Sequence, residues 1–371
     1  MTKDEIQRGI ITDIKLANCR GIILASVRSG KTRILITAIR EHRWLMKIDY
    51  KGAPKVLVLY PNIDIKKSWE DECTKIECPM DITYCTFASM EKVKDGDWDY
   101  VVFDEAHLIP PDTKLIIAGD IARDYKHVIF ASGTYNRTTL ADIKIYTGLP
   151  MIVSYTTEQA IEDGLISDYT VYIHQYDLDP LTKRQFGKIR KWWNTDVEEL
   201  ERLTAAVERL HGEKKMLAAL ARMRFINSNE SLLQALFRWM RDNHGKRFIM
   251  FTENEKFGKK VKIPMFNSKS KDDSVLKEFQ KGFINRLCLI KKGSAGVTYP
   301  NLDNILITSI NSNGETLEQM LGRSLLLDTE HSDIHIFVTD KKFQLEWLKS
   351  ALYNINEDKI VWPDQVKDVS L

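Results

Sequence analysis

The sequence alternates between short apolar runs and segments whose apolar residues follow helical spacing. Runs rich in β-branched residues predict strands that are buried on both faces, and the amphipathic segments between them predict helices. In the first half of the chain the predicted strands are Gly21–Ala25, Val56–Tyr60, Ile82–Phe87, Tyr100–Phe103 and His127–Ala131. This alternation is typical of a parallel sheet flanked by helices, so the predicted fold class is α/β.

The second half repeats the pattern after an interruption. Its predicted strands are Arg247–Phe251, Arg286–Ile290, Ile305–Ile310 and Ile334–Val338. Residues 188–224 show no strand pattern; their apolar positions follow helical spacing, and Gly212 is expected to divide them into a helical pair. We therefore predict two similar α/β domains joined by a linker with a helical insertion, with the bounds 1–165, 166–225 and 226–371.

A loop after the strand at Gly21–Ala25 has the chemistry of a phosphate site. Ser26-Val27-Arg28-Ser29-Gly30-Lys31-Thr32 precedes an amphipathic segment, which is the strand–loop–helix context of the phosphate-loop motif. Backbone N–H groups in such a loop and the dipole of the following helix attract phosphate. Lys31 would reach the β- and γ-phosphates, and the Thr32 hydroxyl would bind Mg²⁺. Ala25 replaces the first glycine of the motif, and Arg28 stands where glycine is common.

Two adjacent carboxylates end another predicted strand. Tyr100–Phe103 runs directly into Asp104-Glu105-Ala106-His107. Open α/β sheets bind ligands at the carboxyl ends of their strands. Asp104 would be an anionic partner of a magnesium-bound nucleotide, and Glu105 a base for the attacking water. The alternative is a strand followed by a solvated acidic turn, and the phosphate loop upstream argues against it.

Composition narrows the class of protein. The 371 residues suffice for two domains, and 43% hydrophobic with 29% charged residues is the balance of a soluble globular protein. No apolar run approaches the ~20 residues that span a bilayer, and Met1–Glu5 lacks a signal-peptide core. Among five cysteines, Cys73 and Cys78 have no second pair to complete a zinc site. We expect a cytoplasmic protein, of a bacterium or a phage-infected host, without a membrane partner.

Two basic features leave alternatives open. The net charge is only +2, so any nucleic-acid surface would be local. Trp192 and Trp193, beside Lys188, Arg190 and Lys191, either stack on a base or pack the helical segment onto a domain. The early second domain is rich in lysine, which makes either a surface that tracks phosphates or an ordinary solvated face. These lysines are Lys256, Lys259, Lys260, Lys262, Lys269, Lys271, Lys277, Lys281, Lys291 and Lys292.

In their order along the chain, these segments resemble the motifs of superfamily 2 helicases and translocases. Ala25–Thr32 resembles motif I, Asp104–His107 the DEAH form of motif II, and Ala131–Thr134 motif III. The other matches are Leu57–Pro61 with Ser68–Glu72 (Ia), Thr83–Phe87 (Ib), Arg247–Phe251 (IV), Gly293–Asp303 (V) and Gln319–Arg323 (VI). The sequence around Trp69 and Trp98 is more similar to the Swi/Snf-type and phage or restriction-type branches than to the DEAD-box branch. The resemblance implies two tandem RecA-like domains that clamp ATP.

The resemblance also implies roles for individual residues. In the catalytic step Glu105 activates water, and Gln319 and Arg323 approach the γ-phosphate from the second domain. The nucleotide and its Mg²⁺ would be held by Gln7, at the adenine, and by Arg28, Ser29, Gly30, Lys31, Thr32 and Asp104, with Thr32 and Asp104 nearest the metal. Coupling between hydrolysis and domain movement would use His107, Ser132, Gly133 and Thr134. Contacts to nucleic-acid phosphates would use Pro61, Thr86, Thr252, Gly296 and Thr298.

One departure from the family pattern concerns the rate of hydrolysis. The family has Gln-x-x-Gly-Arg-x-x-Arg, and the second arginine falls here at Leu326. Three explanations are open: Arg323 alone suffices, Arg28 supplies the second charge, or turnover is slow. The resemblance implies an ATP-dependent helicase or translocase that acts on nucleic acid, DNA more than RNA, with replication, recombination or repair proteins as partners. The alternative is a slow or non-hydrolysing clamp that ATP gates.

Overall fold

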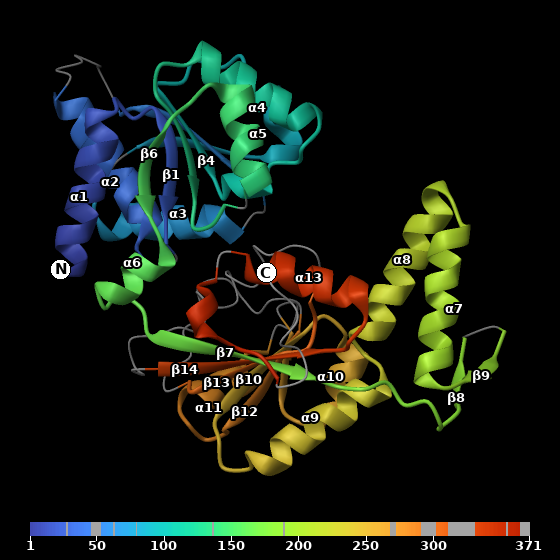
Figure 1. The fold of residues 1–371 in the computed structure, drawn as a ribbon. Helices are drawn as coiled ribbons and strands as arrows, with labels where there is room; N and C mark the ends of the chain where they lie inside the picture. Colours follow the sequence, from blue (N-terminus) through green and yellow to red (C-terminus); the bar gives the residue numbers. More distant parts are fainter. Residues whose placement is uncertain are drawn as a thin grey trace. The chain divides into compact units, whose positions relative to one another are not determined.

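Two parallel β-sheets organise the chain, one in each of two units, Met1–Ile166 and Ser167–Leu371 (Figure 1). The sheets confirm the predicted α/β class. This computed structural model describes residues 1–26, 29–45, 53–61, 64–78, 80–135, 137–187, 190–267, 272–290, 302–310, 331–353 and 355–363. Among these residues, none of the helices has the length and apolar character needed to cross a bilayer.

The first sheet has six strands in the order β3-β2-β4-β5-β1-β6. They are β1 (Gly21–Ala25), β2 (Lys55–Tyr60), β3 (Asp81–Thr86), β4 (Tyr100–Asp104), β5 (Val128–Ser132) and β6 (Met151–Tyr155). The first five lie within a residue or so of the predicted strands, and β6 was not predicted. Every residue of β4 and β5 is buried, as expected for central strands covered on both faces.

Helices cover both faces of the first sheet. They are α1 (Lys3–Leu16), α2 (Lys31–Leu45), α3 (Asp64–Lys75), α4 (Thr113–Asp124), α5 (Arg137–Thr147) and α6 (Thr157–Glu162), with short 3₁₀ turns η1 (Phe87–Lys92) and η2 (Ala106–Leu108). In Figure 1, α1 and α2 pack together on one side of the sheet, and α4 and α5 on the other. This arrangement leaves the carboxyl ends of the strands for the loops that carry the candidate site.

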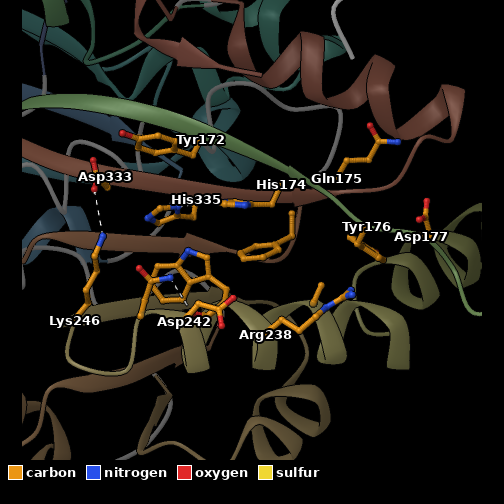
Figure 2. A pocket seen from close by; sticks show the side chains of 14 residues that line it. Tyr172, His174, Gln175, Tyr176, Asp177, Arg238, Asp242, Lys246, Asp333 and His335 are labelled. Carbon is orange, nitrogen blue, oxygen red and sulfur yellow. Dashed lines mark hydrogen bonds and ion pairs between the residues drawn. The ribbon is translucent and has the colours of Figure 1, made fainter. Parts of the chain in front are cut away.

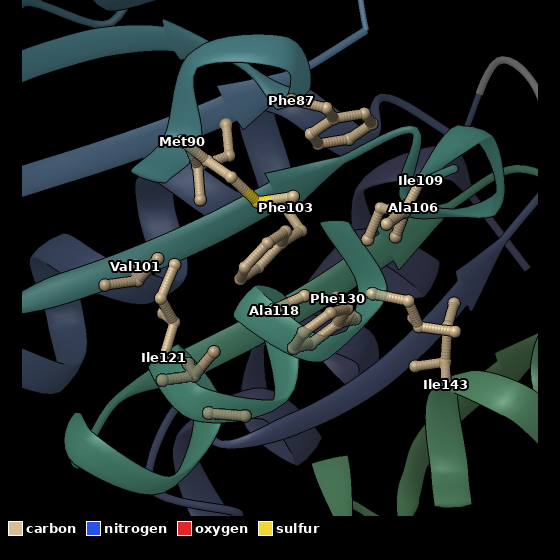
Figure 3. Close-up of a cluster of buried hydrophobic side chains, with 14 of the residues drawn as sticks. Phe87, Met90, Val101, Phe103, Ala106, Ile109, Ala118, Ile121, Phe130 and Ile143 are labelled. Atoms are coloured by element: carbon tan, nitrogen blue, oxygen red, sulfur yellow. The ribbon is translucent and has the colours of Figure 1, made fainter. Parts of the chain in front are cut away.

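A cluster of aromatic and aliphatic side chains holds β4 and β5 in place (Figure 3). The rings of Phe103 and Phe130, one from each strand, stack with their centroids 4.1 Å apart and an interplanar angle of 9°. Ala118 and Ile121 of α4 and Ile143 of α5 belong to the same buried cluster. Because Phe103 directly precedes Asp104, this packing fixes the position from which the acidic pair leaves the sheet.

The second sheet has seven strands in the order β11-β12-β10-β13-β14-β7-β15. They are β7 (Asp168–Gln175), β10 (Phe248–Thr252), β11 (Met265–Asn267), β12 (Arg286–Ile290), β13 (Asn304–Ile307), β14 (His331–Val338) and β15 (Ile360–Val361). Its helices are α9 (Glu230–Asp242), α10 (Glu255–Val261), α11 (Ser274–Gln280) and α13 (Lys342–Leu352), and a 3₁₀ turn, η3 (Glu357–Lys359), precedes β15.

The expectation that residues 166–225 form a linker needs correction. Strand β7 lies inside the second sheet, where it pairs with β14 from His331↔Asp168 to Val338↔Gln175. Its buried positions alternate with partly exposed ones, so its apolar residues never form the continuous run used to recognise the other strands. The segment therefore belongs to the second unit.

The helical pair is confirmed, as α7 (Asp196–Arg209) and α8 (Gly212–Ile226). Gly212 begins α8 with φ +55°, a conformation that side-chain-bearing residues rarely adopt. At the root of the pair, the carboxylate of Asp196 accepts hydrogen bonds from the Ser231 hydroxyl at 2.6 Å and its backbone N–H at 3.0 Å. These bonds tie the start of α7 to the start of α9.

A small antiparallel hairpin consists of β8 (Arg184–Phe186) and β9 (Trp192–Asn194), and β9 lies within the stretch predicted to lack strands. The Trp192 indole N–H donates to Glu199 Oε2 at 2.7 Å, and the Arg202 guanidinium lies 4.5 Å from the Trp192 ring centroid. Trp192 therefore packs the hairpin onto α7, while Trp193 is 61% exposed. The expected packing of the helical segment onto a domain is therefore not what Trp192 does: it packs within that segment, against α7.

Candidate active site

The candidate site lies at the carboxyl edge of the first sheet, where β4, β5 and β1 are neighbours. The register places Asp104 beside Ala131, and Leu24 beside Ser132. The acidic pair, the Ser132 segment and the loop that follows β1 therefore leave the sheet at the same level. Parallel pairing alone brings together three segments that are far apart in the sequence.

Lys31 is the central group of this site. It is the first residue of α2, and its side chain is 14% exposed. Its Nζ lies 2.9 Å from Asp104 Oδ1 and 2.6 Å from Glu105 Oε1. Burial disfavours the charged ammonium, but the two carboxylates outweigh it and raise the pKa of Lys31. Lys31 is therefore a cation held in a largely buried site by two anions.

The loop before Lys31 is fixed by α1. Gln7 is buried, and its side-chain amide donates to the Ser29 carbonyl at 2.6 Å. Gly30 has φ +84°, and a Cβ there would lie 2.3 Å from Gln7 Nε2. Only glycine fits both the backbone conformation and the close approach of Gln7. In this structure Gln7 contacts the loop itself, and its predicted contact with adenine stays a prediction.

The loop also contains an unsatisfied polar atom. Within the described part of the chain, Ser29 Oγ is buried without a hydrogen-bond partner. Next to Lys31, the Thr32 side chain is half-buried. A buried hydroxyl without a partner is costly, and a bound polar group would satisfy it. With Lys31, these donors fit the oxygen atoms of a phosphate chain.

The two acidic residues differ in their surroundings. Asp104 is buried, and its Oδ1 accepts the Glu105 backbone N–H at 2.9 Å while its Oδ2 accepts the Trp69 indole N–H at 2.9 Å. Glu105 is 31% exposed at its side chain and adopts the left-handed backbone conformation, φ 53° and ψ 46°. Asp104 is thus rigidly held, whereas Glu105 faces solvent from a strained turn, as functional residues often do.

The predicted coupling residues form one network beside the acidic pair. His107 Nδ1 lies 2.6 Å from Ser132 Oγ and 3.5 Å from Glu105 Oε2. Ser132 Oγ donates to the Thr134 carbonyl at 2.5 Å and accepts the Thr134 N–H at 3.1 Å. Gly133 lies in the turn between them, partly exposed. The structure therefore links Glu105 to the end of β5.

Other predicted site residues lie elsewhere or outside the described residues. Pro61 follows β2, Thr86 ends β3, and Thr252 ends β10, so each stands at the carboxyl edge of its own sheet. The remaining positions are outside the described residues: Arg28, Gly296, Thr298, Gln319, Arg323 and Leu326.

The lysine-rich surface is partly neutralised. Lys259, Lys260 and Lys277 pair with acidic neighbours at 2.7 to 3.0 Å. Lys269, Lys271, Lys291 and Lys292 are outside the described residues. The three paired lysines therefore fit a solvated, charge-balanced face better than a surface that tracks phosphates.

The second unit contains a cavity of about 650 Å³ that the sequence did not reveal (Figure 2). Figure 2 shows Tyr172, His174 and His335 on the strands β7 and β14, facing Arg238 and Asp242 of α9. Tyr172 and His335 lie side by side because they are paired in the register of β7 and β14. The alternation of buried and partly exposed residues along β7 is the sequence signal that could have indicated this cavity.

Hydrogen bonds fix the protons on the two histidines of this cavity. The Asn304 amide donates to the Arg247 carbonyl at 3.3 Å, so its oxygen faces His335 Nε2 at 3.2 Å. His335 Nε2 is therefore the donor, and His335 Nδ1 accepts from His174 Nε2 at 2.9 Å. Burial, with nearby His174 and Lys246, lowers the pKa of His335 to about 3.

Comparison with known proteins identifies the fold. No protein-family model matches the chain, and no curated protein matches its sequence. The chain is similar to Saccharomyces cerevisiae Dbp5 bound to RNA and ADP BeF3, with a TM-score of 0.55, 12% identity, and coverage of 96% of this chain and 89% of that one. It is also similar to the Pyrococcus furiosus Hef helicase domain, with a TM-score of 0.53 and 13% identity, over 93% of this chain and 97% of that one.

The chain is also similar to a fragment of a putative restriction-enzyme subunit. The fragment structure of a putative HsdR subunit of a type I restriction enzyme from Vibrio vulnificus matches with a TM-score of 0.55 and 16% identity, over 89% of this chain and 63% of that one. The chain therefore shares the fold of these solved structures, with two tandem RecA-like domains. The predicted fold class and resemblance are confirmed at the level of the fold.

The depressed pKa of His335 predicts a pH dependence of stability. A histidine whose pKa falls from 6.5 in the unfolded chain to about 3 in the folded one stabilises the protein fully above pH 6.5, and that contribution is lost as the pH falls toward 3. Between pH 7 and pH 5 the wild type should lose about 2 kcal/mol of unfolding free energy that His335→Gln does not lose.

Urea denaturation at pH 7 and pH 5 measures this difference. His244→Gln is the control, because the side chain of His244 is exposed in the same unit. It should keep the pH dependence of the wild type. Equal pH dependence in the wild type and His335→Gln would contradict the prediction.

Proposed function

We propose that the chain is an ATP-dependent nucleic-acid helicase or translocase, acting on DNA in preference to RNA. One observation carries the proposal: the buried cation of Lys31 lies between Asp104 and Glu105 at the carboxyl edge of a parallel sheet. A phosphate-binding lysine beside a metal-binding carboxylate and a candidate base is the chemistry of nucleotide hydrolysis. The fold and the nucleotide bound to Dbp5 support it.

The residues present fit a nucleotide and Mg²⁺. Ser29 Oγ is a buried donor whose partner a phosphate would supply. Thr32 and Asp104 offer oxygen atoms, which are the ligands that Mg²⁺ prefers. When bound, the metal would neutralise charge on the phosphates. Gln7 and Arg28 would complete the nucleotide site, Gln7 from α1 and Arg28 from the loop.

The chain's own residues would then act in sequence. The ammonium of Lys31 would transfer from the two carboxylates to the phosphate oxygens, because these offer it a compensating charge. Glu105, released from Lys31, would orient a water molecule and accept its proton. Asp104, held by Trp69 and by the Glu105 N–H, would keep its position throughout.

Coupling to movement would use the network beside Glu105. His107, Ser132, Gly133 and Thr134 would pass a change at the acidic pair to the end of β5. From the second domain, Gln319 and Arg323 would complete the charge stabilisation of the reacting phosphate. Loss and recovery of these contacts in each cycle would drive the two domains through alternate states.

Nucleic acid would be held through its backbone. Pro61 and Thr86 on the first domain, and Thr252, Gly296 and Thr298 on the second, are the proposed phosphate contacts. Such contacts give grip without reading the bases. Replication, recombination or repair proteins are the proposed partners that would supply target choice.

A second candidate function rests on Leu326, which stands where the family has its second arginine. The chain would then be a clamp that binds ATP and nucleic acid but turns ATP over slowly or not at all. Arg323 alone, or Arg323 with Arg28, is the alternative that preserves rapid turnover.

Steady-state ATP hydrolysis distinguishes the two candidates. The helicase proposal predicts that single-stranded or duplex DNA stimulates hydrolysis several-fold or more, with RNA tested in parallel. Glu105→Gln should lower the stimulated rate by about 10²–10⁴-fold, the usual contribution of a general base, while Glu91→Gln leaves it unchanged. Hydrolysis that no DNA or RNA structure stimulates would favour the clamp.

Removal of Arg323 tests the contribution of the second domain. Arg323→Ala should lower nucleic-acid-stimulated hydrolysis by on the order of 10³-fold, because an arginine that stabilises the transferring phosphoryl group contributes 10³–10⁵ in rate. ATP binding should survive. Arg241→Ala, at an arginine whose side chain is 76% exposed in the same unit, is the control. Unchanged turnover in Arg323→Ala would refute the role given to Arg323.

A further inference from the structure

Trp69 connects a surface helix directly to the acidic pair. It lies on α3, where it is the one fully buried side chain among the described positions. Its exposed fraction is 0%, and it is the largest fully buried side chain in the described chain. Its indole N–H donates to Asp104 Oδ2 at 2.9 Å. An indole N–H has no other hydrogen-bonding role, so this bond accounts for its polar atom completely.

The bond makes the two oxygen atoms of Asp104 unequal. Oδ2 accepts the indole N–H. Oδ1 faces the loop, where it meets Lys31 Nζ at 2.9 Å and the Glu105 N–H at 2.9 Å. Since both ends of the carboxylate are held, the group cannot rotate. Oδ1 is therefore the oxygen presented to whatever occupies the loop.

Two further contacts join α3 to neighbouring elements of the same unit. The Arg33 guanidinium, two residues after Lys31, lies 3.9 Å from Glu72 Oε1 of α3. Lys66 of α3 lies 5.5 Å from the centroid of the Tyr84 ring on β3. Helix α3 also follows Pro61 at the end of β2, where a nucleic-acid contact is proposed. Trp69 is the point at which this helix touches the acidic pair.

We propose that Trp69 is a positioning residue for Asp104, which fixes the carboxylate so that Oδ1 faces the Mg²⁺ of a bound nucleotide. The inference rests on the proposed function, since it concerns the same site. Without the indole N–H, Oδ2 loses its donor and the carboxylate is free to turn. Groups that orient a metal-binding residue in this way typically contribute 10- to 100-fold to metal affinity.

Trp69→Phe tests this, with Trp98→Phe as a matched control. The Trp98 indole N–H also makes a hydrogen bond, to the Val93 carbonyl at 2.8 Å in the same unit, but it does not contact Asp104. Calorimetric titration with the non-hydrolysable analogue AMP-PNP over a series of Mg²⁺ concentrations measures nucleotide and metal binding without turnover. In Trp69→Phe the Mg²⁺ concentration for half-saturation should rise about 10-fold or more. Metal-free binding of AMP-PNP should stay unchanged, and Trp98→Phe should match the wild type.

A second variant separates the effect of the indole N–H on Asp104 from the packing of the Trp69 ring. Replacing Trp69 with benzothienylalanine exchanges the N–H for sulfur and keeps the shape of the ring. It should shift the Mg²⁺ dependence as Trp69→Phe does, even if Trp69→Phe itself fails to fold. An unshifted Mg²⁺ dependence in the benzothienylalanine chain would overturn the inference and leave the proposed function intact. A wild type that does not bind AMP-PNP with Mg²⁺ would overturn both.

Discussion

The buried ammonium of Lys31 is the constraint on which the candidate site depends. A cation that is 14% exposed must have an anionic partner, and here it has two, Asp104 and Glu105. The same pairing prepares an exchange, because an incoming phosphate chain offers Lys31 another set of negative charges. Asp104 is then left to its remaining donors, Trp69 and the Glu105 N–H, and Glu105 becomes available as a base.

The fold places the partners of Lys31 beside it by aligning the ends of three parallel strands. Parallel pairing brings the ends of β4, β5 and β1 to one edge of the sheet. The stacked rings of Phe103 and Phe130 hold β4 and β5 together. Just before α2, Ser29 is held by Gln7 and Gly30 has a positive φ. In our proposal, Arg323 of the second domain would add a further positive charge to the same chemistry.

The elements nearest the site were predictable, and the contacts that hold them were not. The strands at Gly21–Ala25 and Tyr100–Phe103 are continuous apolar runs, and carboxyl ends of parallel strands share an edge, so the meeting of Lys31 with Asp104 follows from the pattern. Trp69 lies 35 residues from Asp104 in the chain, and no periodicity indicates where an indole N–H points. The sequence pattern does not predict strand β7 because five of its eight residues are only partly buried, and it therefore does not predict the cavity beside β7 either.

Equilibrium binding of ATP with Mg²⁺ to the wild type and to Lys31→Met tests the central claim most directly. Methionine keeps the length of the side chain and removes its charge. Lys66→Met, on α3, is the control for loss of a surface lysine in the same unit. We expect the wild type and Lys66→Met to bind ATP equally, and Lys31→Met to bind about 10- to 100-fold more weakly, as the loss of hydrogen bonds to a charged group implies. Equal affinity of all three chains would contradict the account.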